Sequence, residues 1–207
     1  MELLRGIHII RGEISNMYLI DTATEILLVD AGIPSDSEKV LSYVSALGKK
    51  IDAIFVTHAH WDHVGGLKYL KEATGARVVA HRDEVPYIHG DIPGRRKFEP
   101  VDVDMVVEDG SELFGLLVIH TPGHTSGSSC LLDRERKALF VGDLVYEESG
   151  VLHEMYHHYS RDPQENRESI IKLLNYDFTH IFPSHGNPIL WRGREILGSL
   201  VKSFQLH

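Results

Sequence analysis

The chain contains a single cysteine, Cys130, among 207 residues. One thiol cannot form an internal disulfide, so the cysteine content gives no indication of an oxidising compartment. Residues 1–5 lack the charged-then-apolar order of a secretory signal peptide. No apolar run reaches the roughly 20 residues that a membrane-spanning helix needs. We therefore expect a cytoplasmic protein with no membrane partner.

Basic residues are scarcer than acidic ones, 21 against 30, and the formal net charge is −9 with histidine neutral. A nucleic-acid-binding surface usually needs a basic stripe, so we expect no nucleic-acid partner. Linker-like Ser/Gly/Pro tracts, long charge blocks and repeats are also missing from the sequence. A chain of this length can bury one good core, and we expect one domain over residues 1–207.

Histidine, in contrast, is abundant, and His58, His60 and His63 fall within six residues together with Asp62. They follow the apolar run 51–56, which predicts a buried strand ending in a loop. We expect the first two histidines to point into one cavity, and Asp62 and His63 to turn back toward it as the next helix begins. Imidazole and carboxylate ligands without a thiolate suit zinc, and also iron or manganese. A loop that draws on further, distant residues is typical of a catalytic site, and two ions are one option.

Apolar periodicity and turn residues predict strands and helices in alternation. Strands are expected at 7–10, 17–20, 26–29, 51–56, 77–80, 105–107, 116–119, 129–132, 138–141 and 181–182, and helices at 35–47, 64–73, 163–174 and 194–204. Residues 91–100, with prolines, Gly94 and three consecutive cations, predict a loop. This order predicts two half-structures with helices packed outside, an α/β fold with four layers in an αββα sandwich.

Four further segments repeat the pattern of an apolar strand that ends in a polar residue near a glycine. The expected strand ends lead to Asp30, to His124, to Asp143 and to His185. Strand ends are rigid, so their side chains can meet the tight tolerance of a metal site. Glycine beside them lets the backbone approach the site closely.

The ordered set of His58, His60, Asp62, His63, His124, Asp143 and His185 resembles the metallo-β-lactamase superfamily of hydrolases. This resemblance implies the metallo-β-lactamase fold and two divalent metal ions, zinc first and iron or manganese as alternatives. By the same resemblance, His58, His60 and His124 hold the first ion, while Asp62, His63 and His185 hold the second. Asp143 bridges both ions, and Asp30 orients a ligand by hydrogen bonding.

The implied chemistry is hydrolysis by a hydroxide that bridges the ions. Two dications about 3.5–4 Å apart lower the pKa of a shared water toward about 7 and can polarise a substrate carbonyl. Asp62 is the expected acceptor of the nucleophile's proton. The sequence contains no G-x-S-x-G elbow, and the implied mechanism needs no serine or cysteine nucleophile.

Departures from family subtypes narrow the substrate. The commonest lactam-hydrolysing subclass carries Arg where His63 stands and Cys where Asp143 stands, so we do not expect antibiotic hydrolysis. Flavodiiron proteins differ too, because they carry Glu where His60 stands. Hydroxyacylglutathione hydrolase matches all seven ligands, yet Asn187 stands where that enzyme presents a tyrosine, and its helical glutathione-binding region is expected to be missing. We therefore predict a hydrolase of a small-molecule thioester or related ester that does not require glutathione.

Two alternatives stay open. Lactonases of the superfamily carry a tyrosine three residues after the bridging aspartate, where Tyr146 stands, and its hydroxyl could donate a hydrogen bond during catalysis. Persulfide dioxygenases hold one iron with the equivalents of His58, His124 and Asp143, so a mononuclear iron dioxygenase is the other alternative. A homodimer is also open.

Several polar residues have no assigned role. His153, His157 and His158 either line the mouth of the site or lie at the surface or in a subunit contact. Arg95, Arg96 and Lys97 form either a solvated loop or an anchor for an anionic substrate. His81 is expected to cap or pack locally, Trp61 to pack under the histidine loop, and Cys130 to lie inert in a strand.

Overall fold

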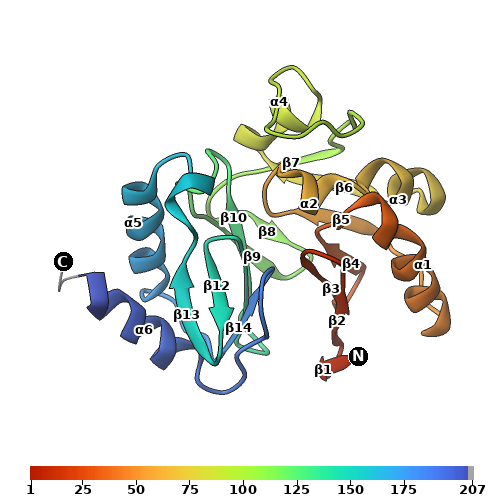
Figure 1. Cartoon of the computed structure of the whole chain (residues 1–207). Helices are drawn as coiled ribbons and strands as arrows, with labels where there is room; N and C mark the ends of the chain where they lie inside the picture. Colours follow the sequence, from red (N-terminus) through yellow and green to blue (C-terminus); the bar gives the residue numbers. More distant parts are fainter. Residues whose placement is uncertain (205–207) are drawn as a thin grey trace. The chain divides into compact units, whose positions relative to one another are not determined.

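The computed structural model describes residues 1–204 and divides them into two compact units, of which the first is Met1–Val107 and the second begins at Glu108 (Figure 1). Each unit contains a β-sheet with helices packed against it, as expected for the two half-structures. The prediction of one domain over residues 1–207 stays a prediction, and residues 205–207 lie outside the described part. No helix among residues 1–204 is long and apolar enough to cross a lipid bilayer.

The first unit is built on a seven-stranded sheet in sequence order, β1 to β7. Its strands are β1 (Glu2–Leu4), β2 (Ile7–Arg11), β3 (Asn16–Asp21), β4 (Ile26–Val29), β5 (Ala53–Val56), β6 (Arg77–His81) and β7 (Met105–Val107). The strands β1 to β4 pair antiparallel, whereas β4 to β7 pair parallel. Parallel neighbours need crossover connections. Here these connections carry α1 (Ser37–Ala46), α2 (Trp61–Val64), α3 (Leu67–Thr74) and α4 (Val85–Ile88).

One face of this sheet forms the core of the first unit with α1 and α3 (Figure 1). Met17, Leu28 and Ile54 point to this face and are fully buried with Val40 of α1 and Leu67 of α3. Alternate residues of each strand point to this face, and the residues between them are buried as well, so burial runs along almost the whole of β3, β4 and β5. This packing fixes the strand ends from which the candidate ligands project.

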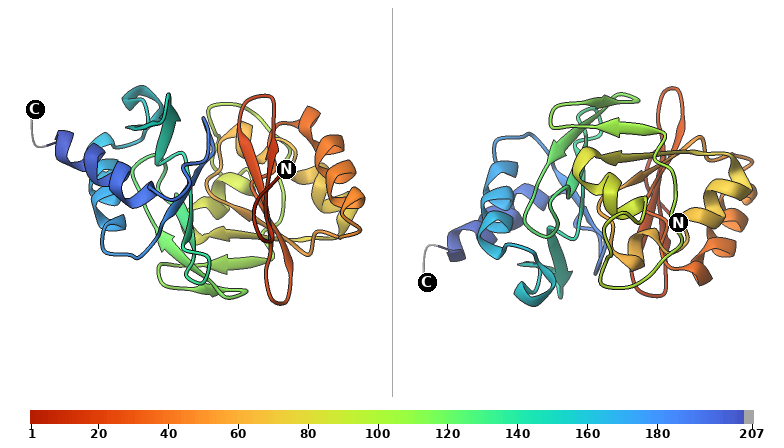
Figure 2. Two further views of the ribbon diagram at one scale, coloured as in Figure 1. Left: turned by 90° about the horizontal axis from the view of Figure 1, so that it is seen from below. Right: turned by 90° about the horizontal axis from the view of Figure 1, so that it is seen from above.

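The second unit has a five-stranded sheet in the order β14-β11-β10-β9-β8, and a separate hairpin formed by β12 and β13. Its elements are β8 (Glu112–Leu113), β9 (Leu116–His120), β10 (Ser129–Asp133), β11 (Ala138–Gly142), β12 (Val145–Glu148), β13 (Val151–Glu154), α5 (Pro163–Leu173), β14 (His180–Pro183) and α6 (Gly193–Ser203). Both α5 and α6 lie on one side of the sheet (Figure 2). Ile170 of α5 and Leu197 of α6 are fully buried there with Ile119, Leu139 and Ile181.

The structure differs from the sequence expectation at several elements: the short β1, β8 and α4 were not expected, and two other differences are larger. The expected helix at 64–73 is two helices, α2 and α3, separated at Gly65 and Gly66. A Cβ at Gly66 would lie 2.5 Å from the carbonyl oxygen of Ala31, so the chain turns where a glycine permits this approach. The hairpin of β12 and β13 was not expected, because its residues show no clear apolar alternation.

Candidate metal centre

The parallel strands of the first unit deliver candidate residues to one edge of its sheet. Asp30 follows β4, Thr57 and His58 follow β5, and His81 ends β6. Carboxyl ends of parallel strands lie at the same edge, so these side chains gather there. Asp30 and His58 are buried, with 0% and 1% of their surfaces exposed.

The four candidate ligands of the histidine loop are brought together, as their spacing predicted. Nε2 of His58 lies 3.1 Å from Nδ1 of His60, and the rings of His58 and His63 have centroids 4.0 Å apart. Nε2 of His63 lies 3.5 Å from Oδ2 of Asp62. His60 is the residue before α2, and Asp62 and His63 lie in its single turn, so this short helix turns the last two side chains back toward the first two.

Asp30 holds this loop in place with both carboxylate oxygens. Oδ1 accepts the backbone N–H of Thr57 at 2.8 Å, and Oδ2 accepts the Thr57 hydroxyl, also at 2.8 Å. Oδ2 also lies 2.8 Å from Nδ1 of His63. Asp30 adopts φ 61°, a left-handed conformation that aspartate tolerates better than most residues. Its contacts are those expected of a residue that orients His63.

Glu84 is a buried carboxylate of this region that sequence reasoning missed. Its surface is 0% exposed, and Oε2 accepts the backbone N–H of Ala59, between the first two histidines, at 2.7 Å. Glu84 lies 25 residues downstream, in a short helical turn after β6. The only available signal was an acidic residue shortly after a strand end, which is too common to single it out.

The second unit delivers three candidate ligands to one edge of its own sheet. The strands β9 and β11 each pair antiparallel with β10, and β14 pairs parallel with β11. The strands β9, β11 and β14 therefore run in the same direction. His124, Asp143 and His185 follow these three strands, so they emerge at the same edge.

Asp143 lies between the two histidines of this unit. Oδ2 lies 3.6 Å from Nε2 of His124, and Oδ1 lies 3.3 Å from Nε2 of His185. Each oxygen thus faces a different imidazole. His124 and Asp143 are buried, whereas the side chain of His185 is 27% exposed.

Two glycines allow the close backbone packing that places these residues. Gly123, directly before His124, has φ 129°, and a Cβ there would lie 2.1 Å from the backbone nitrogen of Asn166 in α5. Gly186, directly after His185, has φ 91°, and a Cβ there would lie 2.1 Å from the carbonyl oxygen of Glu147. No larger residue fits at either position without moving the backbone.

Glu147 ties the His185 loop to the hairpin and was also missed from sequence. Its backbone N–H donates to the carbonyl of His185 at 3.0 Å. Its buried carboxylate accepts the backbone N–H groups of Asn187 and Gly150, both at 2.5 Å. The loop that carries His185 is therefore anchored on β12.

Tyr146 lies in β12, inside an aromatic stack. Its ring stacks on His153 and on Tyr156, each with centroids 5.1 Å apart. Burial and a hydrogen bond with Tyr156 raise the pKa of Tyr146 to about 12. An ordinary tyrosine is already protonated at neutral pH, so the Tyr146 phenol can act as a hydrogen-bond donor there.

The other unassigned histidines of the hairpin region are exposed. Nε2 of His157 lies 3.1 Å from Glu154, and His158 packs on Tyr159 with ring centroids 4.0 Å apart. Their roles stay open. His153, in contrast, lies directly against Tyr146.

Three smaller expectations can be compared with the structure. Nδ1 of His81 accepts the backbone N–H of Asp83 at 3.2 Å, so His81 caps the turn after β6, as predicted. Cys130 is fully buried in β10, and burial raises the pKa of its thiol to about 12, in agreement with an inert residue. The guanidinium of Arg96 lies over the Trp61 ring, 4.9 Å from its centroid, and the packing of Trp61 under the histidine loop stays a prediction.

The donor set of each unit fits a transition-metal ion. Three of the histidines have a polar neighbour at Nδ1. Nδ1 of His63 lies 2.8 Å from Asp30, and Nδ1 of His58 lies 3.1 Å from the Thr57 hydroxyl. Nδ1 of His124 lies 3.5 Å from the Ser160 hydroxyl. Metal-binding histidines usually fix their second ring nitrogen in this way, which leaves Nε2 for the ion.

The spacings between the candidate ligands point the same way. Two nitrogens bound tetrahedrally to one zinc lie roughly 3.3 Å apart, close to the 3.1 Å between His58 and His60. The 3.6 Å between His124 and Asp143 is too long for a hydrogen bond but suits two ligands of one ion. Imidazole and carboxylate donors without a thiol suit zinc, iron or manganese.

Sequence comparison identifies related proteins along most of the chain. The family model of the metallo-β-lactamase superfamily matches residues 10–185. The chain is 28% identical to the probable metallo-hydrolase YflN of Bacillus subtilis (strain 168), over 91% of this chain and 86% of YflN. It is 35% identical to a hydroxyacylglutathione hydrolase of Ectopseudomonas mendocina, over 55% of this chain and 40% of that enzyme.

Solved structures with this fold agree. TTHA1623, determined in a di-iron-bound form, matches with a TM-score of 0.74 and 29% identity, over 93% of this chain and 94% of its own. A motif mutant of a metallo-β-lactamase from Cronobacter sakazakii matches with a TM-score of 0.79 and 23% identity, over 100% of this chain and 95% of its own. The predicted α/β class and metallo-β-lactamase fold are thereby confirmed. Since the family model covers most of the sequence, the chain belongs to the metallo-β-lactamase superfamily, whose members are largely hydrolytic metalloenzymes.

Proposed function

We propose that this protein hydrolyses thioesters or related esters with two divalent ions. The proposed first ion is held by His58, His60 and His124. The proposed second ion is held by Asp62, His63 and His185, and Asp143 is shared by both. Zinc is the first choice of metal, and the di-iron form of the related TTHA1623 supports iron as the alternative.

The observation that carries this proposal is the position of the Asp143 carboxylate. Its two oxygens face different histidines, at 3.6 Å from His124 and 3.3 Å from His185. A carboxylate that served one ion would need only one of these neighbours. The same pairing is expected if Asp143 bridges two ions, and it supports a dinuclear centre over a mononuclear one.

In the proposed reaction the bound ions and the side chains of the protein have different roles. When bound, two divalent ions supply an activated water at neutral pH and polarise a carbonyl. Asp62, a residue of α2 whose side chain is 22% exposed, is the proposed acceptor of the proton of the attacking water. Asp30 keeps His63 in one orientation, and Glu147 keeps the His185 loop in place, so the ligands do not need to reorganise during the reaction.

The choice of a thioester rests on leaving-group chemistry and on the relatives. A thiolate leaves without a dedicated general acid, and the sequence offers no obvious one. The related Ectopseudomonas protein is named as a hydrolase of hydroxyacylglutathione, and the chain matches 40% of that protein's length. This match supports thioester cleavage as the reaction class.

Tyr146 supports lactone hydrolysis as the second candidate function. A tyrosine hydroxyl is already protonated at neutral pH, and burial raises the pKa of Tyr146 further, to about 12. A neutral phenol three residues after Asp143 can donate a hydrogen bond to a carbonyl or a leaving oxygen. This would help an oxygen leaving group more than a thiolate.

A substrate panel at fixed metal loading tests the proposal. The panel compares acyl thioesters, with and without glutathione, and lactones by kcat/KM. We expect thioesters to be the better substrates, without a requirement for glutathione. Lactones that exceed every thioester by tenfold, about 1.4 kcal/mol of transition-state discrimination, would establish the lactonase instead. Oxygen consumption with a persulfide substrate would establish the mononuclear iron dioxygenase.

The remaining expectations belong to the same proposal. We propose a cytoplasmic enzyme with a small-molecule substrate and no nucleic-acid partner. The net charge of −9 supports the last point. A homodimer stays an open alternative.

A further inference from the structure

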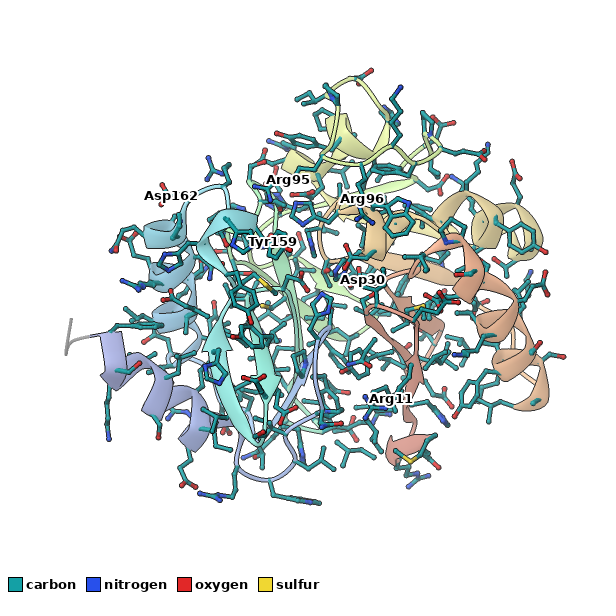
Figure 3. All side chains as sticks on the ribbon, in the orientation of Figure 1. Arg11, Asp30, Arg95, Arg96, Tyr159 and Asp162 are labelled. Atoms are coloured by element: carbon teal, nitrogen blue, oxygen red, sulfur yellow. The ribbon has the colours of Figure 1, made fainter. Side chains whose placement is uncertain are left out.

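The loop between α4 and β7 carries three consecutive cations in an otherwise acidic chain. Arg95, Arg96 and Lys97 are all exposed, and the chain as a whole has a net charge of −9. Figure 3 shows Arg95 and Arg96 among the side chains of this loop. The local excess of positive charge on this loop attracts small anions.

Arg96 is held over the segment that carries candidate ligands. Its guanidinium carbon lies 4.9 Å from the centroid of the Trp61 ring. Trp61 stands directly between His60 and Asp62, and it begins α2. The cation–π contact therefore fixes a flexible, exposed side chain beside the histidine loop.

The stacking leaves the hydrogen-bonding edge of the guanidinium available. A guanidinium uses its face on an aromatic ring and its N–H edge on a carboxylate or phosphate. Within residues 1–204, no carboxylate lies within ion-pair distance of Arg96. Several other arginines of the described chain do have such partners, as Arg192 has Glu195 at 2.6 Å.

We infer that Arg96, stacked on Trp61, binds an anionic group of the substrate, so that the preferred substrates are anionic thioesters. This inference rests on the proposed thioester hydrolysis and names its substrate class. Arg95 and Lys97 add to the attraction at longer range. The anionic group is a carboxylate, as in glutathione, or a phosphate, as in coenzyme A, and either matches the guanidinium fork.

Three thioesters with the same acyl group test the inference. Acyl-glutathione carries carboxylates, acyl-coenzyme A carries phosphates, and acyl-N-acetylcysteamine is neutral. We expect the protein to prefer at least one anionic substrate over the neutral one by kcat/KM. Arg96→Gln should lower kcat/KM for that substrate roughly 10- to 100-fold, the range expected for a charge-assisted hydrogen bond, and leave the neutral substrate unchanged.

The controls separate charge recognition from a structural effect. Lys50→Gln removes the same charge from an exposed position before β5, at the end of that strand opposite the histidine loop, and should change none of the three rates. Raising ionic strength should reduce the anionic preference of the natural protein more than that of Arg96→Gln, which keeps only the long-range attraction of Arg95 and Lys97. Equal losses for neutral and anionic thioesters in Arg96→Gln would overturn the inference.

A binding measurement keeps the inference separate from the proposed reaction. The chain has two tryptophans, so Trp61 alone reports by fluorescence in a Trp191→Phe background. The thioethers S-butylglutathione and S-butyl-coenzyme A should change this fluorescence on binding, and Arg96→Gln should weaken the binding. If no thioester is hydrolysed but this binding is observed, the anion site stands and the proposed reaction fails. If neither thioether binds in an Arg96-dependent way, the anion site is refuted whatever the enzyme cleaves.

Discussion

The carboxylate of Asp30 lies 2.8 Å from Nδ1 of His63, and both side chains are almost completely buried. The two residues are 33 positions apart in sequence: Asp30 follows β4, and His63 lies in α2, which follows the neighbouring parallel strand β5. The contact fixes which nitrogen of His63 can face an ion.

Replacing Asp30 should weaken the metal centre without unfolding the protein. Asparagine also tolerates the left-handed backbone at this position, but its amide cannot accept hydrogen bonds with both ends. We expect Asp30→Asn to lower metal affinity by about 10- to 100-fold for the ion that His63 binds. A competitive chelator titration measures this loss.

Asp21→Asn provides the matched control. Asp21 ends β3 opposite Ile26, the first residue of β4, and so lies at the other edge of the sheet from Asp30. This variant should titrate like the natural protein. Unchanged affinity for every ion in Asp30→Asn would show that Asp30 does not support a ligand.

Replacing Asp143 should remove bound metal, whereas replacing Tyr146 should lower only the rate. Asp143→Ala takes away the carboxylate next to both His124 and His185, so we expect loss of bound metal and of activity together. Tyr146→Phe should keep its metal and cost at most about 2.7–4 kcal/mol of transition-state stabilisation, as for an oxyanion donor. Metal analysis combined with kcat/KM distinguishes the two. Comparable loss of metal in both variants would mean that their roles are misassigned.

Glu84 should contribute to stability through the backbone of the histidine loop. Glu84→Ala leaves the buried N–H of Ala59 without its carboxylate acceptor, which we expect to cost about 1.5–3 kcal/mol. Glu84→Gln retains an acceptor and should cost less. Urea unfolding measures both, with the exposed Glu135→Ala as a control. Equal stability of Glu84→Ala and Glu135→Ala would contradict this account.

Cys130 should make stability depend on alkaline pH. Burial raises the pKa of its thiol from 9.0 to about 12, so the folded state disfavours the thiolate. The contribution is fully present below pH 9 and is lost as pH rises toward 12, because the unfolded chain ionises first. We expect Cys130→Ala to flatten the decline of stability between pH 9 and 11. Rapid labelling of the native thiol by a maleimide at neutral pH would contradict the buried position.

The strand ends were predictable from sequence because each apolar run stops at a polar residue or a glycine. The apolar run before Thr57 predicted β5 and its last residue. The apolar runs that lead to His124 and Asp143 predicted both ends of β9 and β11 to within one residue. The chemistry of a ligand is local, so its residue type and spacing are visible in the sequence. The fold class followed from the same strands and from the family resemblance.

The supporting residues were not predictable, because their partners are distant in sequence. Glu84 binds a backbone group 25 residues upstream, and Glu147 binds one 40 residues downstream. The break at Gly66 depends on the carbonyl of Ala31, and that approach exists only after the sheet has formed. Tyr146 was identified by its spacing from Asp143, but its stacking on His153 required the hairpin.

The number of metal ions bound by the purified protein decides whether the centre is dinuclear. Seven candidate ligands are more than one ion uses, and Asp143 faces histidines with both oxygens. The account predicts close to two equivalents of zinc, iron or manganese per chain after gentle purification, and close to one or fewer in Asp143→Ala. A firm value of one equivalent, unchanged when any of these metals is added, would contradict the dinuclear centre.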